Sequence, residues 1–199
     1  FSERNFLGRG QTVRAGVSTV SGGQALSFSF IEPNFLARDI SLGLSGYYEQ
    51  TQTQDRSFDT EDFGAATSVS FPVSENGRAG LRYSIDRNEI IFSDASRANS
   101  SPIITADEGD RLVSALRASY SFDNRTTGLN PNAGVALEFS ATYAGLGGDA
   151  EYLLTEARAV AERAVLREEV TLRATVEGGA LDTLNGNSNY NDRFFLSSR

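Results

Sequence analysis

Five residue types that carry much of protein chemistry are missing from this chain of 199 residues: histidine, cysteine, methionine, tryptophan and lysine. Their absence excludes imidazole and thiolate metal sites, Ser-His-Asp and Cys-His nucleophiles, Schiff bases and the lysine of a phosphate-binding loop. No carboxylates are spaced for acid–base catalysis, so we predict no enzyme and no cofactor. All 18 basic residues are arginine, and 26 acidic residues bring the net charge to −8, which disfavours a nucleic-acid partner.

Long hydrophobic runs are missing too. No stretch approaches the roughly 18 apolar residues of a membrane helix, and no signal segment opens the chain. A membrane-spanning structure is therefore possible only as a β-barrel, since lipid requires every backbone polar group to be paired internally. Because the sequence begins at Phe1 and contains no methionine, we expect a mature product or a piece of a longer protein.

Apolar and polar residues alternate with a period of two along most of the sequence, which is the pattern of half-buried β-strands. We predict strands over residues 11–19, 24–31, 40–48, 63–73, 79–85, 112–122 and 135–143. In each segment the apolar face carries no charge, and the opposite face is small and polar. Strands of about 9 to 11 residues cross a bilayer at a tilt, so these segments have a length suited to a membrane.

Two β architectures fit the alternation equally well. In an outer-membrane barrel the apolar face contacts lipid, whereas in a soluble β-sandwich or lipocalin-like barrel it packs inside. Aromatic residues near the strand ends favour the membrane barrel, and the missing tryptophan slightly disfavours it. Charged residues on the polar face favour the barrel, because a water-filled lumen spares the cost of burying them; these are Arg14, Arg82, Arg117, Glu138, Arg158 and Arg173.

Two long polar stretches, at about 50–61 and 87–109, lie on the same side of the expected sheet, and the turns on the other side are mostly shorter. Outer-membrane barrels show this asymmetry between extracellular loops and periplasmic turns. Two acidic groups lie in or directly beside the long stretches, one of Asp59, Glu61 and Asp62 and one of Asp107, Glu108 and Asp110. Either group could ligate a divalent cation, but the spacing matches no known loop, and solvated loop charge is the favoured interpretation.

Residues 151–169 allow two interpretations. Their abundance of Ala, Glu, Leu and Arg favours a helix by intrinsic propensity, with Leu153, Ala157, Val160 and Ala164 at helical spacing. The same residues also alternate as a strand that ends in a turn near 163–168 and is followed by a second strand. A lone helix would interrupt the series of hairpins, so we predict strand, turn and strand.

Several strings of residues, spread over nearly the whole chain, are similar to motifs of a known family. N-F-L-G-R-G at 5–10 precedes one strand, and E-P-N-F at 32–35 ends the next. D-N-R at 123–125 is followed by a proline and a glycine, although Thr126 stands where the family has an acid, and D-R-F-F-L closes the series at 192–196. Together these strings resemble the barrel of the outer-membrane barrel-assembly factors, in the bacterial surface antigen superfamily.

The resemblance implies structural roles, in turns and aromatic girdles, for a set of family-signature positions. These positions are Asn5, Phe6, Gly8, Gly10, Pro33, Phe35, Asp123, Arg125, Pro131, Gly134, Arg193 and Phe194. It assigns no catalytic, cofactor-binding or metal residue to this segment, because the seam and the sixth-loop motif on which the family's function centres lie elsewhere.

The fold implied is all-β, an incomplete antiparallel transmembrane β-barrel of the outer-membrane type. Residues 1–5 would end the second strand of a sixteen-stranded barrel, and nine further strands would follow. Residues 1–199 would then be part of a C-terminal barrel domain, with the other barrel strands and the N-terminal POTRA domains outside this sequence.

The function implied is that of the family, which folds and inserts β-barrel proteins into the outer membrane of Gram-negative bacteria by β-augmentation at a lateral seam. The implied partners are outer-membrane lipid and lipopolysaccharide, unfolded outer-membrane proteins, and assembly-complex lipoproteins bound through the POTRA domains. Two alternatives stay open: a translocation or secretion pore of the same superfamily, and a soluble β-sandwich or β-barrel binding module.

Overall fold

The computed structural model describes residues 1–20, 22–51, 58–92, 109–125, 133–165 and 170–185. Each strand in this part of the chain pairs antiparallel with the next, so the strands form one sheet in sequence order. The elements are β1 (Ser2–Phe6), β2 (Gln11–Val20), β3 (Gly23–Glu32), the 3-10 turn η1 (Phe35–Ala37), β4 (Ser41–Thr51), β5 (Phe58–Ser74), β6 (Gly77–Phe92), β7 (Gly109–Asp123), β8 (Ala133–Ala144), β9 (Glu151–Val165) and β10 (Val170–Asn185). The predicted all-β antiparallel fold is confirmed.

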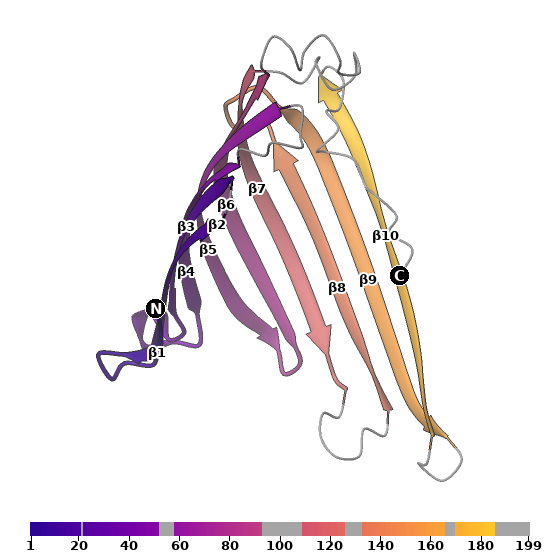
Figure 1. Cartoon of the computed structure of the whole chain (residues 1–199). Helices are drawn as coiled ribbons and strands as arrows, with labels where there is room; N and C mark the ends of the chain where they lie inside the picture. The colour runs from indigo at the N-terminus through magenta and orange to yellow at the C-terminus, as the bar shows by residue number, and fades with distance from the viewer. Residues whose placement is uncertain (21, 52–57, 93–108, 126–132, 166–169, 186–199) are drawn as a thin grey trace.

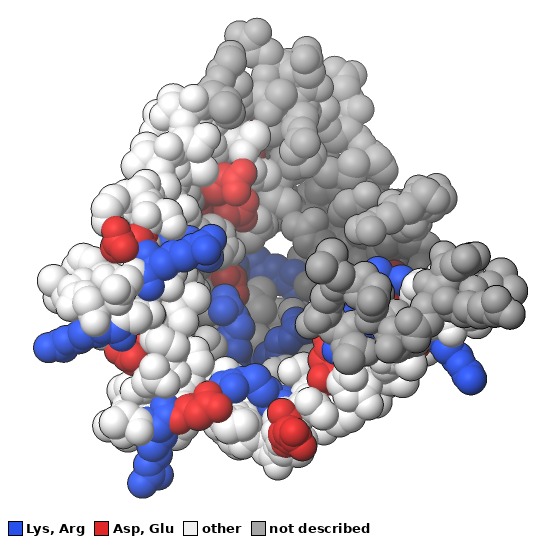
Figure 2. All heavy atoms as spheres, turned by 90° about the horizontal axis from the view of Figure 1, so that it is seen from below, with Lys and Arg blue, Asp and Glu red and all other residues white. Residues whose placement is uncertain are grey.

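The sheet curls around a hollow that is open along one side (Figure 1). Because the strands run up and down in sequence order, the connections β1–β2, β3–β4, β5–β6, β7–β8 and β9–β10 all lie at one end. We call this end, drawn lowest in Figure 1, the turn end, and the opposite end the loop end. Viewed from the turn end, charged side chains face the hollow (Figure 2).

The register keeps apolar residues on the outer face of the sheet, which we call the outer wall. One row across β2 to β5 consists of Val17, Leu26, Tyr48 and Phe63, each directly opposite the next. Val17 is 79% exposed, and Leu26 and Phe63 are about half exposed. A soluble sandwich would bury such a face against a second layer. The exposed outer wall therefore rules out the soluble alternative and matches a wall that faces lipid.

Few apolar side chains are buried in the described part of the chain. They are Phe92, Ala115, Ala136, Ala144, Ala150 and Val160, and four of these six are alanines. Such small residues leave no packed apolar interior on the inner face of the sheet, which we call the inner wall. The fold is held by the ladder hydrogen bonds between strands and by its environment, rather than by an enclosed core.

The strands are longer than the sequence predicts. β5 has 17 residues and β6 has 16, whereas about 9 to 11 suffice to cross a bilayer. Pairing of β5 with β6 continues as far as Phe58 opposite Phe92, inside the stretches expected to be polar connections. Those predicted boundaries, 50–61 and 87–109, are therefore wrong, because cross-strand pairing orders polar residues that alternation alone does not identify as strand.

The same extension corrects the interpretation of the acidic groups as loop charge. Asp59, Glu61 and Asp62 all lie within β5, where successive side chains point to opposite faces. Asp62 accepts a hydrogen bond from Asn88 on the inner wall, while Asp59 and Glu61 lie on the other face. These three carboxylates do not converge on one cation. In the second group, Asp110 accepts a hydrogen bond from Arg87 at 2.7 Å, and residues 107 and 108 lie outside the described part.

Residues 151–165 form strand β9, so the prediction of a strand over the competing helix is confirmed. β9 pairs with β8 on one side and with β10 on the other, and these two ladders satisfy its backbone in place of helical hydrogen bonds. The strand continues to Val165, so residues 163–165, which the sequence assigns to the turn, belong to the strand.

Among the residues that the structure describes, no helix is long and apolar enough to cross a membrane.

A tyrosine fitted against a glycine links three strands on the inner wall. The ring of Tyr47 on β4 covers Gly64 on β5, where an added Cβ would overlap the ring. The Tyr47 hydroxyl donates a hydrogen bond to Asp86 Oδ1 on β6 at 3.1 Å. Gly64 is therefore required by the close approach of an aromatic ring.

Gly64→Ala is expected to lower the free energy of unfolding of the full-length protein by about 1–2 kcal/mol, because the Tyr47 ring must move to admit the methyl group. Gly178→Ala is the matched control: no atom lies within 4 Å of an added Cβ there, so stability should stay equal or rise slightly. Urea titration followed by heat-modifiable migration in SDS gels measures both. Equal effects at the two positions would contradict this packing.

Candidate functional site

The inner wall of β7 to β10 carries a ladder of alternating charges. Glu138 on β8 lies directly opposite Arg158 on β9, and Arg158 lies directly opposite Glu177 on β10. One step toward the loop end, Ser140 lies opposite Glu156. We define the inner-wall charge ladder as Arg117, Glu138, Glu156, Arg158 and Glu177.

Arg117 is the best-bonded member of the ladder. Its Nη2 donates to Ser140 Oγ at 2.8 Å and lies 2.9 Å from Glu156 Oε2, and the Ser140 hydroxyl in turn donates to Glu156 at 3.1 Å. Arg117 also lies directly opposite Arg82 of β6, and like charges in that position repel. The negative charge of Glu156 offsets this repulsion. The contacts among Arg117, Ser140 and Glu156 therefore hold the Arg117 side chain along the wall.

Arg158 lies between two carboxylates at longer range. Its Nη1 is 3.9 Å from Glu138 and its Nε is 3.8 Å from Glu177. The two carboxylate side chains are 62% and 75% exposed, so water screens both pairs and each contributes little to stability. Their effect is to set the charge of a hydrated surface.

The ladder lines a groove of about 580 Å³ on the inner wall. Gly178 and Gly179 of β10 keep one side of the groove free of side chains. In the described part of the chain no group of three or more acidic side chains is placed to hold a metal ion. The donors and acceptors of the groove suit hydrogen bonding to water or to a polar polypeptide.

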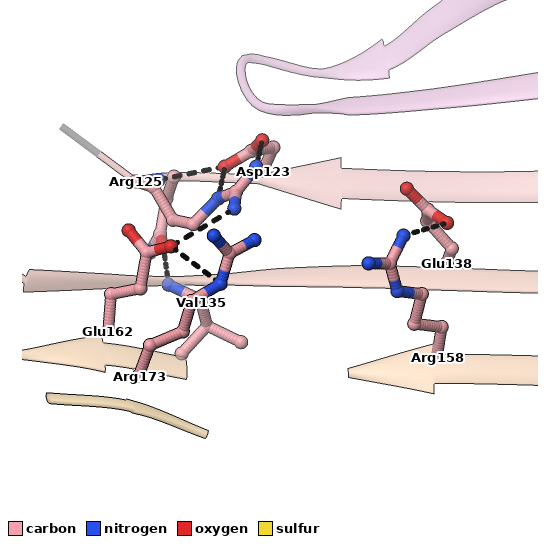
Figure 3. Close-up of polar contacts among 8 residues, drawn as sticks. Asp123, Arg125, Val135, Glu138, Arg158, Glu162 and Arg173 are labelled. Carbon is pink, nitrogen blue, oxygen red and sulfur yellow. Dashed lines mark hydrogen bonds and ion pairs between the residues drawn. The ribbon is translucent and has the colours of Figure 1, made fainter. Parts of the chain in front are cut away.

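A second cluster closes the turn end of the same strands (Figure 3). Arg125, just past β7, forms a bidentate pair with Asp123, with Nε at 2.9 Å and Nη2 at 2.7 Å from the two carboxylate oxygens. Its Nη1 lies 3.4 Å from Glu162 on β9, and Arg173 Nε on β10 lies 3.3 Å from the same oxygen. Two predicted signature residues, Asp123 and Arg125, thus join β7 to β9 and β10.

Arg125 is held in its charged form by the carboxylates around it. Hydrogen bonds to Asp123, and the negative charges of Asp123 and Glu162, raise the pKa of the Arg125 guanidinium above its usual value. The Glu162 side chain is only 16% exposed, so two arginines neutralise one nearly buried carboxylate. Glu162 is not one of the signature positions. The one sequence feature that could have identified it is its inward-facing position on the predicted strand over residues 151–162.

Gly134 is a signature position whose need for glycine the structure explains. A Cβ on Gly134 would overlap the backbone Cα of Arg125, so a side chain there would push the two apart. Beside it, Asn124 Oδ1 accepts a hydrogen bond from the Val135 amide at 2.7 Å. These contacts fix the ends of the β7–β8 connection. The remaining position of this motif, Pro131, lies outside the described residues, as do Arg193 and Phe194.

The first signature string forms the β1–β2 turn. Asn5 Oδ1 accepts a hydrogen bond from the Gly10 amide at 2.7 Å and so closes the turn with its side chain. Gly8 and Gly10 both have φ of +72°, a left-handed conformation that glycine adopts without strain. Phe6 ends β1 and is 36% exposed.

The second signature string lies beside the first. Gln11 Nε2 donates a hydrogen bond to Glu32 Oε2 at 2.5 Å, which ties the start of β2 to the end of β3. Pro33 follows directly, and its Cγ lies 3.9 Å from the place of a Cβ on Gly10. Phe35 begins η1, and its amide donates to the Ile40 carbonyl at 2.8 Å. The described signature positions therefore gather at the turn end in two groups, on β1–β4 and on β7–β10.

A family model of the Omp85 superfamily domain matches residues 5–199 of the chain. The chain belongs to the Omp85 superfamily. Omp85 proteins are outer-membrane proteins of Gram-negative bacteria, so the outer wall faces the lipid of that membrane. This confirms the resemblance drawn from the sequence strings and the expected localisation.

The Omp85 chain is similar to the outer membrane protein assembly factor BamA of Neorickettsia risticii, with 23% identity over 199 residues. That match covers 99% of the chain and 27% of the relative. The fold is similar to the crystal structure of BamA from Haemophilus ducreyi lacking POTRA domains 1–3, with a TM-score of 0.71 and 18% identity. Here the match covers 92% of the chain and 37% of the solved one. The chain thus spans well under half the length of either relative.

Glu162→Gln is expected to lower the free energy of unfolding of the full-length protein by about 1–2 kcal/mol, because Arg125 and Arg173 lose the nearly buried carboxylate that they share. Glu177→Gln is the control, since its 75% exposed side chain lies 3.8 Å from Arg158 in water and its loss should cost less than about 0.5 kcal/mol. Urea unfolding of both variants in one detergent gives the comparison. A larger loss at Glu177 would refute the ranking.

Proposed function

We propose that this Omp85 chain is part of the barrel wall of an outer-membrane protein assembly factor, which folds β-barrel proteins and inserts them into the outer membrane. The main support is a continuous series of hairpins with an apolar outer wall and a hydrated, charged inner wall. Similarity in sequence and fold to assembly factors named BamA supports the same role. In this proposal residues 1–199 belong to a C-terminal barrel domain, and further barrel strands and POTRA domains complete the protein.

The mechanism follows from backbone pairing. In β-augmentation, a substrate strand adds to an unpaired strand edge and gains main-chain hydrogen bonds. Strands β3 to β9 each have a neighbouring strand on both sides, so they offer no free strand edge of this kind, whereas β1 pairs only with the first part of β2. The substrate strand would therefore be templated at a seam elsewhere in the barrel. The present segment would hold the barrel wall in register while that seam opens.

This mechanism needs no nucleophile, metal or cofactor, so the proposed protein is not an enzyme. Its partners would be unfolded outer-membrane proteins at the seam, lipid and lipopolysaccharide around the outer wall, and assembly-complex lipoproteins on the POTRA domains. No nucleic acid takes part. A second candidate, a translocation or secretion pore of the same superfamily, is favoured by the hydrated groove beside the inner-wall charge ladder.

An assembly assay separates the two candidates. The full-length protein is reconstituted into vesicles, and a urea-denatured eight-stranded outer-membrane protein is added as substrate. Folding of the substrate is measured by its faster migration in unheated SDS gels. An assembly factor should speed folding at least severalfold over vesicles that hold a passive porin. A porin-like rate together with ion conductance would favour the pore.

A disulfide inside the wall tests where the substrate strand pairs. Leu81 of β6 and Ala118 of β7 lie directly opposite each other, and the chain has no cysteine of its own. Oxidation of the Leu81→Cys, Ala118→Cys variant should leave the assembly rate within about twofold of the reduced variant, because this pair need not open. Loss of assembly on oxidation, reversed by reductant, would place the working seam within this segment.

A further inference from the structure

Two turns at the turn end share one sequence pattern that the proposed function does not use. Asn5 to Arg9 have the sequence N-F-L-G-R, and Asn34 to Arg38 have the sequence N-F-L-A-R. The first begins with the last two residues of β1 and the second follows β3, so both lead into equivalent connections of the sheet. We call these two segments the twin turns.

The twin turns also share their hydrogen bonds. In the first, the Gly8 amide donates to the Asn5 carbonyl at 2.9 Å and the Arg9 amide donates to the Phe6 carbonyl at 3.2 Å. In the second, the corresponding donors and acceptors lie 3.0 and 3.3 Å apart; they are Ala37 to Asn34 and Arg38 to Phe35. One local structure is therefore repeated one hairpin later.

Both turns hold a leucine in a conformation that L-residues disfavour. Leu7 has φ of +54° and Leu36 has φ of +58°. Glycine adopts these values without steric strain, whereas a leucine Cβ crowds the backbone. Strained backbone of this kind tends to occur where a side chain has a function. Ala37 shares this conformation with φ of +56°, so the strain alone does not identify a function, and the exposure of the leucine side chains carries the argument.

Both leucine side chains are exposed in the described part of the protein. Leu7 is 76% exposed and Leu36 is 73% exposed, among the highest values for its large apolar residues. The twin turns are neighbours, because Pro33 approaches Gly10 and Gln11 bonds to Glu32. The two exposed leucines thus lie on neighbouring turns at the turn end, and we call the exposed surface of these two turns the patch.

An exposed arginine follows each leucine by two residues. Within the described residues neither Arg9 nor Arg38 lies within ion-pair distance of a carboxylate. The nearby Asp39 is engaged by Arg78 at 3.1 Å, and Glu32 accepts hydrogen bonds from Gln11 and from the Asn34 amide. The patch therefore offers two apolar side chains and two exposed arginines without a close ion pair among the described residues, although Arg9 acts on Glu32 at longer range.

We propose that the twin turns bind the membrane leaflet at the turn end, with Leu7 and Leu36 in the acyl boundary and Arg9 and Arg38 on anionic lipid phosphates. Apolar insertion beside basic charge is how protein surfaces hold anionic interfaces. The outer wall begins near the twin turns, where Val13 lies opposite Phe30. Lipid that surrounds the outer wall would therefore have its headgroups close to these turns. The β1–β2 turn bends sideways from the lower end of the sheet, toward that position (Figure 1).

This inference rests on the proposed membrane wall, so the test includes a position that reports on the wall itself. Single cysteines replace Leu7, Leu36, Glu75 or Val17 in the full-length protein, and each carries the same nitroxide spin label. Val17 lies on the outer wall, and Glu75 lies in the β5–β6 turn at the same end as the twin turns. Collision rates with oxygen and with a nickel chelate give the depth of each label in phosphatidylcholine vesicles, with and without phosphatidylglycerol.

We expect the Val17 label to be deep, the Leu7 and Leu36 labels to lie at the interface, and the Glu75 label to be aqueous. Phosphatidylglycerol should lower nickel access at Leu7 and Leu36 at least twofold, and the double variant Arg9→Gln, Arg38→Gln should remove that response. Because all four positions carry the same label, its own hydrophobicity cannot produce the difference.

Three results would overturn the inference. Aqueous labels at Leu7 and Leu36 beside a deep Val17 label would reject the lipid anchor and leave the membrane wall intact. Labels at Leu7 and Leu36 that are shielded from both oxygen and the nickel chelate would show that protein covers the turns instead. An aqueous Val17 label would reject the membrane wall and the anchor together.

Discussion

The structure depends on one constraint: every backbone amide and carbonyl within the lipid must find its partner inside the protein. Neighbouring antiparallel strands satisfy this constraint between β2 and β10, where each strand pairs with the next in sequence order. The same ladders fix the register, and the register fixes which residues face outward. Val17 and Phe63 can stay exposed because the partner of the outer wall is lipid rather than a second protein layer.

The inner wall follows from the same arrangement. Since the curled sheet encloses a hydrated hollow, charged residues such as Arg117 and Glu156 can pair along the wall without the full cost of burial. The carboxylate that is most shielded from water among these pairs lies near the turn end. Near the turn end Glu162 collects two arginines from different strands, whereas Arg158 has only solvated contacts. Hairpin ends are thus tied together where the chain reverses, and the middle of the wall remains polar and open.

Three local structural features occur in the short turns at the turn end. Glycine admits a close approach at Gly134, an asparagine side chain closes the β1–β2 turn, and two leucines accept a left-handed backbone. The first two features stabilise the turns themselves. The third does not, because a glycine would fit the same backbone with less strain. This difference connects the local geometry of the turns to the membrane outside them.

The sequence by itself determined the strands, their faces and the family, because a period of two and turn motifs are local signals. It also indicated strand over helix for β9, but only through the expected series of hairpins. Pairing between strands decided three features that the local sequence does not reveal. It extended β5 and β6 into polar residues, and it placed Asp62 on the opposite face from Asp59 and Glu61. It also brought Arg125 into contact with Glu162. Each depends on which residue of a neighbouring strand lies opposite, and that register is set across the sheet rather than along the chain.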